Sequence, residues 1–257
     1  MLIDVIILSL CKSKDIYDIN INCIDTLIKS EKEHQFNIIL MESNKGFFEL
    51  GYGYDYDNVT VVIPEEDFNY NAFLNIGIRR SSAEFIVAAN NDLIFKKNWF
   101  SEIVKSQKCF PDVHSFCPYD PDNEPNLSEI YPQDILFGYR LRKEMVGWCI
   151  VFDRKVLEKM PKFDERFSYY FQDNDYANEM RKSNMKHARV MTSHVVHLGS
   201  ETSNQNDTFS YEHRGTEDEK VFLNKWGSYK KQHYRNRLHE ILTANKLSFI
   251  SRFLYWI

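Results

Sequence analysis

Residues 85–92 read Phe-Ile-Val-Ala-Ala-Asn-Asn-Asp, a short apolar run that ends in three polar residues. The apolar run predicts a strand over residues 84–89, because short runs bounded by turn-forming residues are typical of buried strands. In an open α/β sheet, ligands bind beyond the carboxyl ends of the strands. Asp92 would stand at such an end, where a carboxylate can hold a hard divalent cation. A plain strand-ending turn is the alternative, since Asn and Asp favour turns.

The segments before this strand alternate between strand and helix patterns. Residues 2–10 form a continuous apolar run, which is typical of a strand buried on both faces of a parallel sheet. Apolar spacing predicts helices over 16–30 and 70–81, and further strands over 36–41 and 59–63. Strands alternating with helices predict βαβ units, and therefore an α/β fold with a mostly parallel central sheet flanked by helices.

The second half of the sequence is less regular. Residues 110–133 hold five of the seven prolines, so we expect a loop-rich excursion there. The pattern that follows predicts a strand over 146–152, a helix over 154–159, a helix over 173–183, a strand over 188–196, a polar linker over 200–207 and helices from 211 onward. We therefore expect one domain over 1–205 and a helical C-terminal extension over 206–257.

Composition excludes several classes of protein. The chain has 257 residues, of which 43% are hydrophobic and 27% charged, and this argues against wholesale disorder. Its five cysteines include no Cys-x-x-Cys pair, which argues against a disulfide framework or a structural zinc site and favours a reducing compartment. No apolar run reaches the ~18 residues of a membrane span, and the start, with Asp4, predicts a strand rather than a signal peptide. We expect a cytoplasmic protein.

Two later segments carry residues of catalytic types. Asp173 would stand at the start of a helix, where free amide groups stabilise a carboxylate that can accept a proton from an alcohol. Capping of that helix is the alternative role. His194 and His197 lie in a predicted strand and would face nearly opposite sides, so we do not expect them to bind one metal together. A structural role is the alternative for each.

The order of these segments resembles that of the family 2 glycosyltransferases, which have the GT-A fold. The resemblance covers about residues 3–202, and residues 68–78 resemble the segment that precedes the family's metal motif. The pieces that carry it are Asn90-Asn91-Asp92, Gly147-Trp148-Cys149, Phe163-Asp164-Glu165-Arg166-Phe167, Gln172-Asp173-Asn174-Asp175 and His197-Leu198-Gly199.

The resemblance implies a role for each matching residue. Asp92 would bind Mn²⁺ or Mg²⁺ on the diphosphate, His197 would be a further metal ligand, and Asp173 would be the catalytic base. The residues implied at the substrates are Ser9 and Leu10 under the nucleotide, Glu42 at the base or ribose, Asn75 at the donor pocket, Asn91 within the metal motif, Gly147 and Trp148 at the sugar and acceptor, and Asp175 at the helix or the acceptor side.

The implied reaction is an inverting sugar transfer. A nucleotide-diphosphate sugar, with a UDP-sugar favoured, would donate to a hydroxyl of a glycan or a lipid-linked acceptor. A divalent metal would neutralise the leaving diphosphate, and one carboxylate on the opposite face would take the proton of the acceptor.

Three alternatives remain open from the sequence. The basic and aromatic residues of segment 225–237 suit an acceptor that is a modified base in DNA, although the net charge of −5 weighs against it. Gln172 and Asn90, where the family has acidic residues, favour a non-catalytic module that binds nucleotide sugars or glycans. The amphipathic end, 247–257, would pack on the domain, form a dimer contact or lie peripherally on a membrane surface. A nucleotidyltransferase is disfavoured because residues 9–14 contain no glycine.

Overall fold

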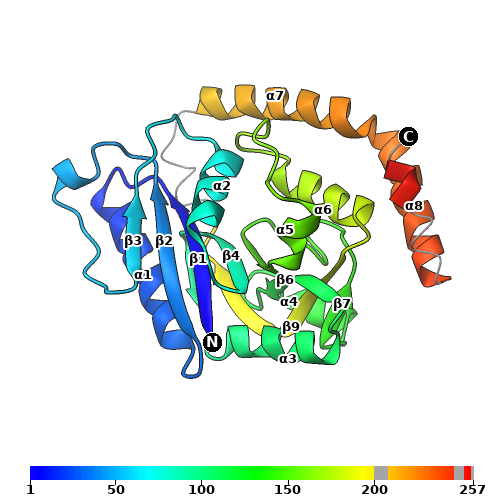
Figure 1. Ribbon diagram of the computed structural model, residues 1–257, viewed down its shortest axis with the longest axis horizontal. Coiled ribbons are helices and arrows are strands. Elements are labelled where there is room, and N and C mark those ends of the chain that lie inside the picture. Colours follow the sequence, from blue (N-terminus) through cyan, green and yellow to red (C-terminus); the bar gives the residue numbers. More distant parts are fainter. Residues whose placement is uncertain (200–207, 246–251, 256–257) are drawn as a thin grey trace.

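The computed structural model describes residues 1–199, 208–245 and 252–255. Within these residues, nine strands form one sheet (Figure 1), in the order β3-β2-β1-β4-β8-β6-β9-β5, with β7 on β9. The strands are β1 (Leu2–Ser9), β2 (Gln35–Glu42), β3 (Val59–Val62), β4 (Phe85–Asn90), β5 (Leu93–Phe95), β6 (Val113–Tyr119), β7 (Ile135–Phe137), β8 (Cys149–Asp153) and β9 (Lys186–His197).

Helices surround this sheet and join many of its strands. They are α1 (Lys14–Ser30), α2 (Tyr70–Arg80), α3 (Trp99–Cys109), α4 (Pro125–Ile130), α5 (Lys155–Lys159), α6 (Gln172–Lys182), α7 (Thr208–Trp226) and α8 (Tyr229–Ala244), with the short 3₁₀ segments η1 (Phe48–Leu50) and η2 (Arg252–Tyr255). The predicted α/β architecture is confirmed. Strands β1, β2, β3, β4, β6 and β9 run in one direction, and β5, β7 and β8 run against them.

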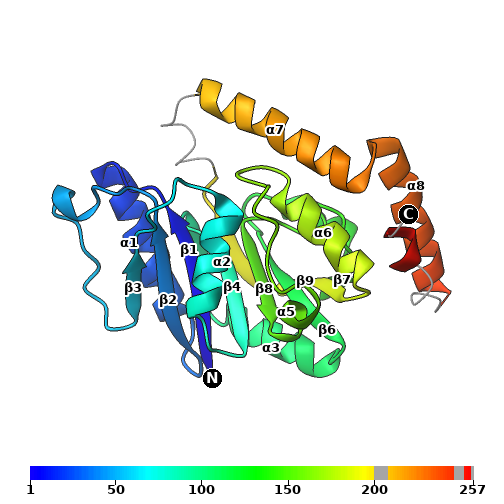
Figure 2. The ribbon, with the colours of Figure 1, turned by 45° about the horizontal axis from the view of Figure 1, so that its top comes forward.

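Two apolar layers hold the helices against the two faces of the sheet. On one face, Leu27 of α1 and Trp99 of α3 are buried in a cluster with Val87 of β4. On the other face, Phe73 of α2 and Tyr176 of α6 join a second cluster. Figure 2 shows α2 and α6 in front of the sheet. The sheet therefore has both faces covered, as the continuous apolar runs predicted.

The prediction of a loop-rich excursion over 110–133 is wrong. The segment contains β6 and α4, and its prolines occupy positions that regular structure tolerates. Pro125 stands in the first turn of α4, where a missing amide hydrogen costs nothing. Pro118 lies at a register shift between β6 and β9, beside Tyr119. Helix α3 was not predicted. In the structure Asn98 precedes it in a left-handed conformation without a side-chain cap.

Helix α7 lies across the end of the sheet at which β1 and β4 terminate, and α8 continues along one side (Figure 1). Phe222 and Trp226 of α7 are buried with Phe167 and with Tyr255 of η2. Helix α7 ends at Gly227, whose positive φ of 80° reverses the chain before α8. The predicted linker over 200–207 lies outside the described residues. Among those described, no helix is long and apolar enough to cross a membrane.

Candidate active site

The carboxyl ends of β1, β2 and β4 meet at one edge of the sheet and gather three of the predicted residues. In the parallel register, Ser9 of β1 lies beside Glu42 of β2. Asn91 follows β4, and its side chain donates to Asn20 Oδ1 at 2.7 Å, while Asn20 Nδ2 donates to Ser9 Oγ at 2.8 Å. All four side chains are buried. Asn20, which the sequence did not single out, thus links Ser9 and Asn91 into one buried hydrogen-bond network.

Glu42 shapes the turns at this edge. Its Oε1 accepts hydrogen bonds from the backbone amides of Cys11, at 3.0 Å, and Asn44, at 2.7 Å. The side chain is fully buried, and burial raises the pKa of its carboxyl above the usual value. Leu10 lies between Ser9 and Cys11 and is half-buried. Glu42 therefore fixes the turns that follow β1 and β2.

Asp92 and His197 face each other at the end of β4. Asp92 Oδ1 lies 3.2 Å from His197 Nε2, and the His197 ring also lies 3.4 Å from Asn90 Nδ2. The pairing of β5 with β9 brings them together, because Leu93 stands opposite His197 in the register. The other histidine of this strand, His194, has its Nε2 3.0 Å from the Met191 carbonyl oxygen.

The Asp92–His197 pair fits a divalent cation that is shared with a substrate. Asp92 is 4% exposed, and its Oδ1 has no hydrogen-bond partner in the part of the chain that the structure describes. This oxygen lies 3.2 Å from His197 Nε2, and the two atoms could together ligate one cation. The described residues contain no group of three or more His, Cys, Asp or Glu side chains that could hold a metal alone. One carboxylate with substrate phosphates is a common way to hold Mg²⁺.

Gly147 and Trp148 connect this pair to Asp173. The Trp148 ring stacks on the His197 ring, with centroids 5.5 Å apart and planes 17° apart. The Trp148 carbonyl oxygen accepts a hydrogen bond from the Asn90 amide at 2.9 Å. On its other side, a Cβ placed on Gly147 would lie 3.2 Å from Asp173 Oδ2. Of two consecutive residues, Trp148 therefore stacks on His197 and Gly147 lies near Asp173, the predicted base.

Asp173 lies in the first turn of α6, after Phe171, whose φ of 61° places it in the left-handed region. The Asn174 amide donates to Asp173 Oδ1 at 2.8 Å, which leaves Oδ2 toward Gly147. Burial raises the pKa of Asp173, and the positive charge of Arg142 acts in the opposite direction. A carboxylate with a raised pKa is a better proton acceptor than an exposed one.

Asn75 lies away from these groups and supports the backbone. Its Nδ2 donates to the Phe163 carbonyl oxygen and to Glu165 Oε1, both at 2.9 Å, and its Oδ1 accepts from the Phe163 amide at 2.9 Å. Since Asn75 is 2% exposed, its amide is engaged within the protein. The implied role at the donor pocket is therefore replaced by the anchoring of the Phe163–Phe167 segment.

Asp175 likewise serves the helix and not the open side of the site. Its Oδ1 accepts from Trp226 Nε1 at 2.7 Å, and Lys225 Nζ lies 2.7 Å from the same oxygen. Burial raises the pKa of Asp175 to about 6, while Lys225 and the Trp226 hydrogen bond lower it. Asp175 therefore holds α7 against α6. It lies two residues after Asp173.

Asp218 is a residue of the site that the sequence analysis missed. Its carboxylate accepts from the backbone amides of Ser168 at 3.0 Å, Tyr169 at 2.9 Å and Tyr170 at 2.8 Å. It is 2% exposed and comes from α7, across the turn that leads into α6. An acidic residue within a charged helical stretch gives no sequence signal for such a contact.

Solved structures that share this fold include two glycosyltransferases. The mannosyltransferase PcManGT from Pyrobaculum calidifontis, in complex with GDP-Man and Mn²⁺, has a TM-score of 0.58 at 13% identity, covering 98% of this chain and 69% of its own. GalNAc-T7 with UDP, GalNAc and Mn²⁺ has a TM-score of 0.57 at 12% identity, covering 76% of this chain and 43% of its own. At such identities the likeness shows the fold, which is the GT-A fold. The sequence matches no protein-family model and no curated protein.

Proposed function

We propose that this protein is a metal-assisted, inverting glycosyltransferase of the family 2 type, with Asp173 as its base. It transfers a sugar from a nucleotide-diphosphate sugar, with UDP as the favoured nucleotide, to the hydroxyl of a glycan or lipid-linked acceptor. The observation that carries the proposal is the position of Gly147 and Trp148: an added Cβ on Gly147 would lie 3.2 Å from Asp173 Oδ2, and the Trp148 ring stacks on the His197 ring. A sugar beside these two residues lies between a proton acceptor and a place for the diphosphate.

The residues of the chain divide the chemistry between them. Asp173 Oδ2 accepts the proton of the acceptor hydroxyl as its oxygen attacks the anomeric carbon. Attack from the face opposite the diphosphate inverts that carbon. The Trp148 ring packs on the apolar face of the sugar and excludes water from the reacting centre. Ser9 and Asn91, which Asn20 links by hydrogen bonds, lie under the nucleotide. Mn²⁺ or Mg²⁺ at Asp92 and His197 supplies, when bound, a Lewis acid for the leaving diphosphate.

The structure gives less support to the other acceptors and partners. A DNA acceptor was suggested by the basic aromatic segment. Trp226 and Arg235 of that segment are buried, so its exposed aromatic residues are Tyr229 and Tyr234, and the net charge of −5 still weighs against DNA. Tyr255 near the chain end packs on Trp226, with ring centroids 6.2 Å apart, which favours packing of the tail on the domain.

We propose that 1–205 forms the transferase domain and that 206–257 completes its acceptor side.

Donor hydrolysis tests the proposal. Purified protein is incubated with UDP-, GDP- and dTDP-sugars in Mn²⁺, Mg²⁺ or EDTA, and released nucleotide is measured beside sugar transfer to a panel of acceptors. We expect release from one donor that EDTA removes. Asp92→Ala should weaken donor binding and turnover together. Asp173→Asn should keep donor binding and lower transfer by about 10²–10⁴-fold, the usual contribution of a general base.

Glu158→Gln is the matched control, since Glu158 is an exposed carboxylate on α5, outside the site. It should behave as the wild type in every assay. Transfer by Asp173→Asn at the wild-type rate would contradict the assignment of the base. Donor binding without turnover in any condition would instead favour the non-catalytic binding module.

A further inference from the structure

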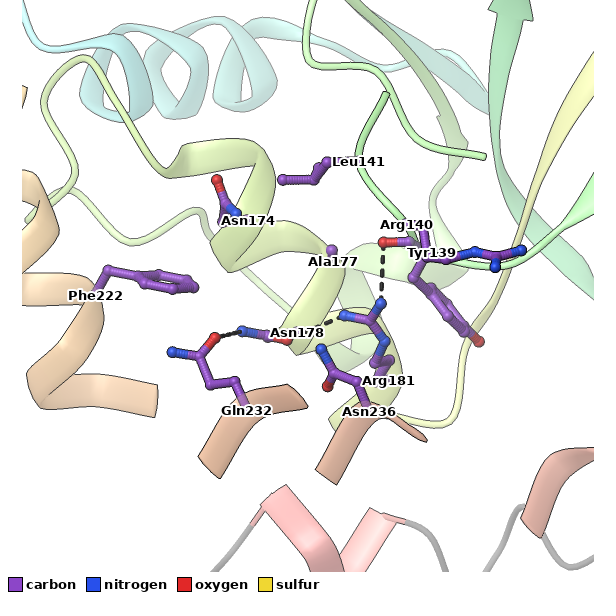
Figure 3. Close-up of a pocket in the computed structure, with 10 residues that line it drawn as sticks. All are labelled: Tyr139, Arg140, Leu141, Asn174, Ala177, Asn178, Arg181, Phe222, Gln232 and Asn236. Atoms are coloured by element: carbon purple, nitrogen blue, oxygen red, sulfur yellow. Dashed lines mark hydrogen bonds between the residues drawn. The ribbon is translucent and has the colours of Figure 1, made fainter. Parts of the chain in front are cut away.

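A cavity of about 240 Å³ lies beside the proposed base (Figure 3). One wall is a single face of α6, formed by Asn174, Ala177, Asn178 and Arg181, which stand at positions i, i+3, i+4 and i+7. The other lining residues are Tyr139, Arg140, Leu141, Phe222, Gln232 and Asn236, from the loop before β8 and from α7 and α8. The cavity is smaller than the ~300–1,000 Å³ of pockets for drug-sized ligands. Its volume suits one small chemical group of a ligand and not a whole drug-sized molecule.

The charges around this cavity are unbalanced. None of its ten described lining residues carries a carboxylate, and two are arginines. Arg140 is neutralised, because its guanidinium donates to both oxygens of Glu144. Arg181 has no carboxylate within ion-pair distance among the described residues. Glu144 and Glu240 act on it only from farther away. The cavity therefore holds one uncompensated positive charge.

Arg181 is also short of hydrogen-bond acceptors. It is 5% exposed, and of its five N–H groups one donates to Asn178 Oδ1 at 3.1 Å and one to the Tyr139 carbonyl oxygen at 3.0 Å. Its Nε has no partner in the described parts of the chain. Burial lowers the pKa of Arg181 below its usual value, as expected for a buried cation without a counter-ion. An anion in the cavity would relieve this cost.

A second basic residue, Arg235, is buried near enough for the charge of Arg181 to act on it. Arg235 of α8 is 8% exposed, and its guanidinium carbon lies 4.4 Å from the centre of the Tyr255 ring. The positive charge of Arg181 further lowers the pKa of Arg235. The described structure shows no carboxylate paired with Arg235. Two like charges buried near one another raise the potential that an anion would meet here.

We propose that this cavity binds a phosphate group of the acceptor, with Arg181 as its anchor, so that the acceptor is a phosphorylated glycan or a lipid-linked sugar phosphate. The proposal rests on the proposed transferase function. Asn174, at one end of the cavity, is the neighbour of Asp173, and Arg181 lies seven residues further along α6, about 10 Å along the axis. A hydroxyl at Asp173 and a phosphate at Arg181 are then about one or two sugar units apart.

Asn236→Asp supplies the missing counter-charge and tests the site. Asn236 Oδ1 accepts from the Tyr255 hydroxyl at 2.7 Å, and an aspartate keeps that acceptor. The new carboxylate should raise the melting temperature, because it faces Arg181, and should weaken the binding of inorganic phosphate about tenfold or more, because like charges repel. Asn224→Asp is the matched control, an equal charge change at an exposed position of α7.

Binding of inorganic phosphate is measured by calorimetry and by melting temperature, at constant ionic strength in chloride. We expect saturable binding in the wild type and in Asn224→Asp that is lost in Asn236→Asp. Equal phosphate effects in all three proteins, or none in any, would overturn the proposal. Since no sugar donor is present, this result is independent of the transferase proposal, which the Asp173→Asn assay tests separately.

Transfer assays then identify the source of the phosphate. Hexose phosphates in solution and vesicles that carry an isoprenoid-linked sugar phosphate are compared with neutral sugars as acceptors. Asn236→Asp should raise the KM for the phosphorylated acceptor that is used and leave the KM for neutral sugars unchanged. Preference for neutral sugars by the wild type would contradict the proposed acceptor class.

Discussion

Gly147 lies so close to Asp173 that an added Cβ would stand 3.2 Å from both Cβ and Oδ2 of the carboxylate side chain. The absence of a side chain at residue 147 therefore allows the carboxylate to occupy its present position. Contacts of this length are tighter than ordinary van der Waals packing, so a methyl group here must displace the carboxylate or the turn that carries it.

Gly147→Ala should lower transfer about 10–100-fold, because small displacements of a catalytic group are costly, while donor binding changes little. Gly53→Ala is the control, since a Cβ there meets nothing within 4 Å. Single-turnover transfer with saturating donor and acceptor measures the effect. Equal rates for the two variants would show that the position of Asp173 relative to residue 147 does not matter.

Asp173→Asn should raise the melting temperature at pH 7. Burial raises the pKa of Asp173 in the folded protein, so the stabilising contribution of the neutral form is present at low pH and is lost as the pH rises through the folded pKa. Asparagine has no charge to bury and keeps the acceptor for the Asn174 amide. Each kcal/mol gained corresponds to roughly 2–4 °C for a chain of this size. Thermal unfolding at pH 7 and pH 4 should show the gain shrinking at the lower pH.

Arg142→Gln should move the acidic limb of the pH profile to higher pH. The positive charge of Arg142 lowers the pKa of Asp173, so its removal lets burial raise that pKa further. The proposed transfer needs the ionised carboxylate, so a higher pKa moves the rise in kcat/KM to higher pH, and the effect is small because Arg142 is exposed. Arg80→Gln, at an exposed end of α2, should leave the profile unchanged.

Asp218→Asn should destabilise the turn that precedes α6. Three backbone amides of residues 168–170 donate to its carboxylate, and an asparagine offers one acceptor oxygen where two are used. Weakening buried, charge-assisted hydrogen bonds costs about 1–3 kcal/mol. Hydrogen exchange of the Ser168, Tyr169 and Tyr170 amides should quicken, with transfer falling in parallel. Unchanged exchange at these amides would contradict the anchoring role, and Glu158→Gln again serves as the control.

The core strands were predictable because burial on both faces forces a continuous apolar run, as in β1 and β4. Strands β5 and β7 have three residues each, too few to form a pattern. Helix α3 has a buried stripe, and Asn98 before it is a residue type that often begins helices, so its pattern was present in the sequence and was missed. Prolines misled over 110–133, because tertiary pairing accommodated them at a helix start and a strand irregularity.

The site was predictable as far as local motifs reach. Asp92 and His197 were expected near one metal and lie 3.2 Å apart, a proximity that the pairing of β5 with β9 creates. Asn75 was expected at the donor pocket, and its side chain bonds to Phe163 within the protein. Asp175 was expected at the helix or the acceptor side, and its bond to Trp226 agrees with the first of these. Asp218 is separated from Ser168 by fifty residues, and no local pattern encodes a contact at that distance.

The fifty residues between Ser168 and Asp218 also mean that the two are made at different times during synthesis. Domains fold from the N-terminus during synthesis, so strands β1 to β4 can pair before α7 leaves the ribosome. The Ser168–Tyr170 backbone has no carboxylate to shape it until α7 emerges and docks. A released chain that ends before residue 218 should therefore lack the carboxylate that holds the Ser168–Tyr170 turn, and the proposed transfer should require α7.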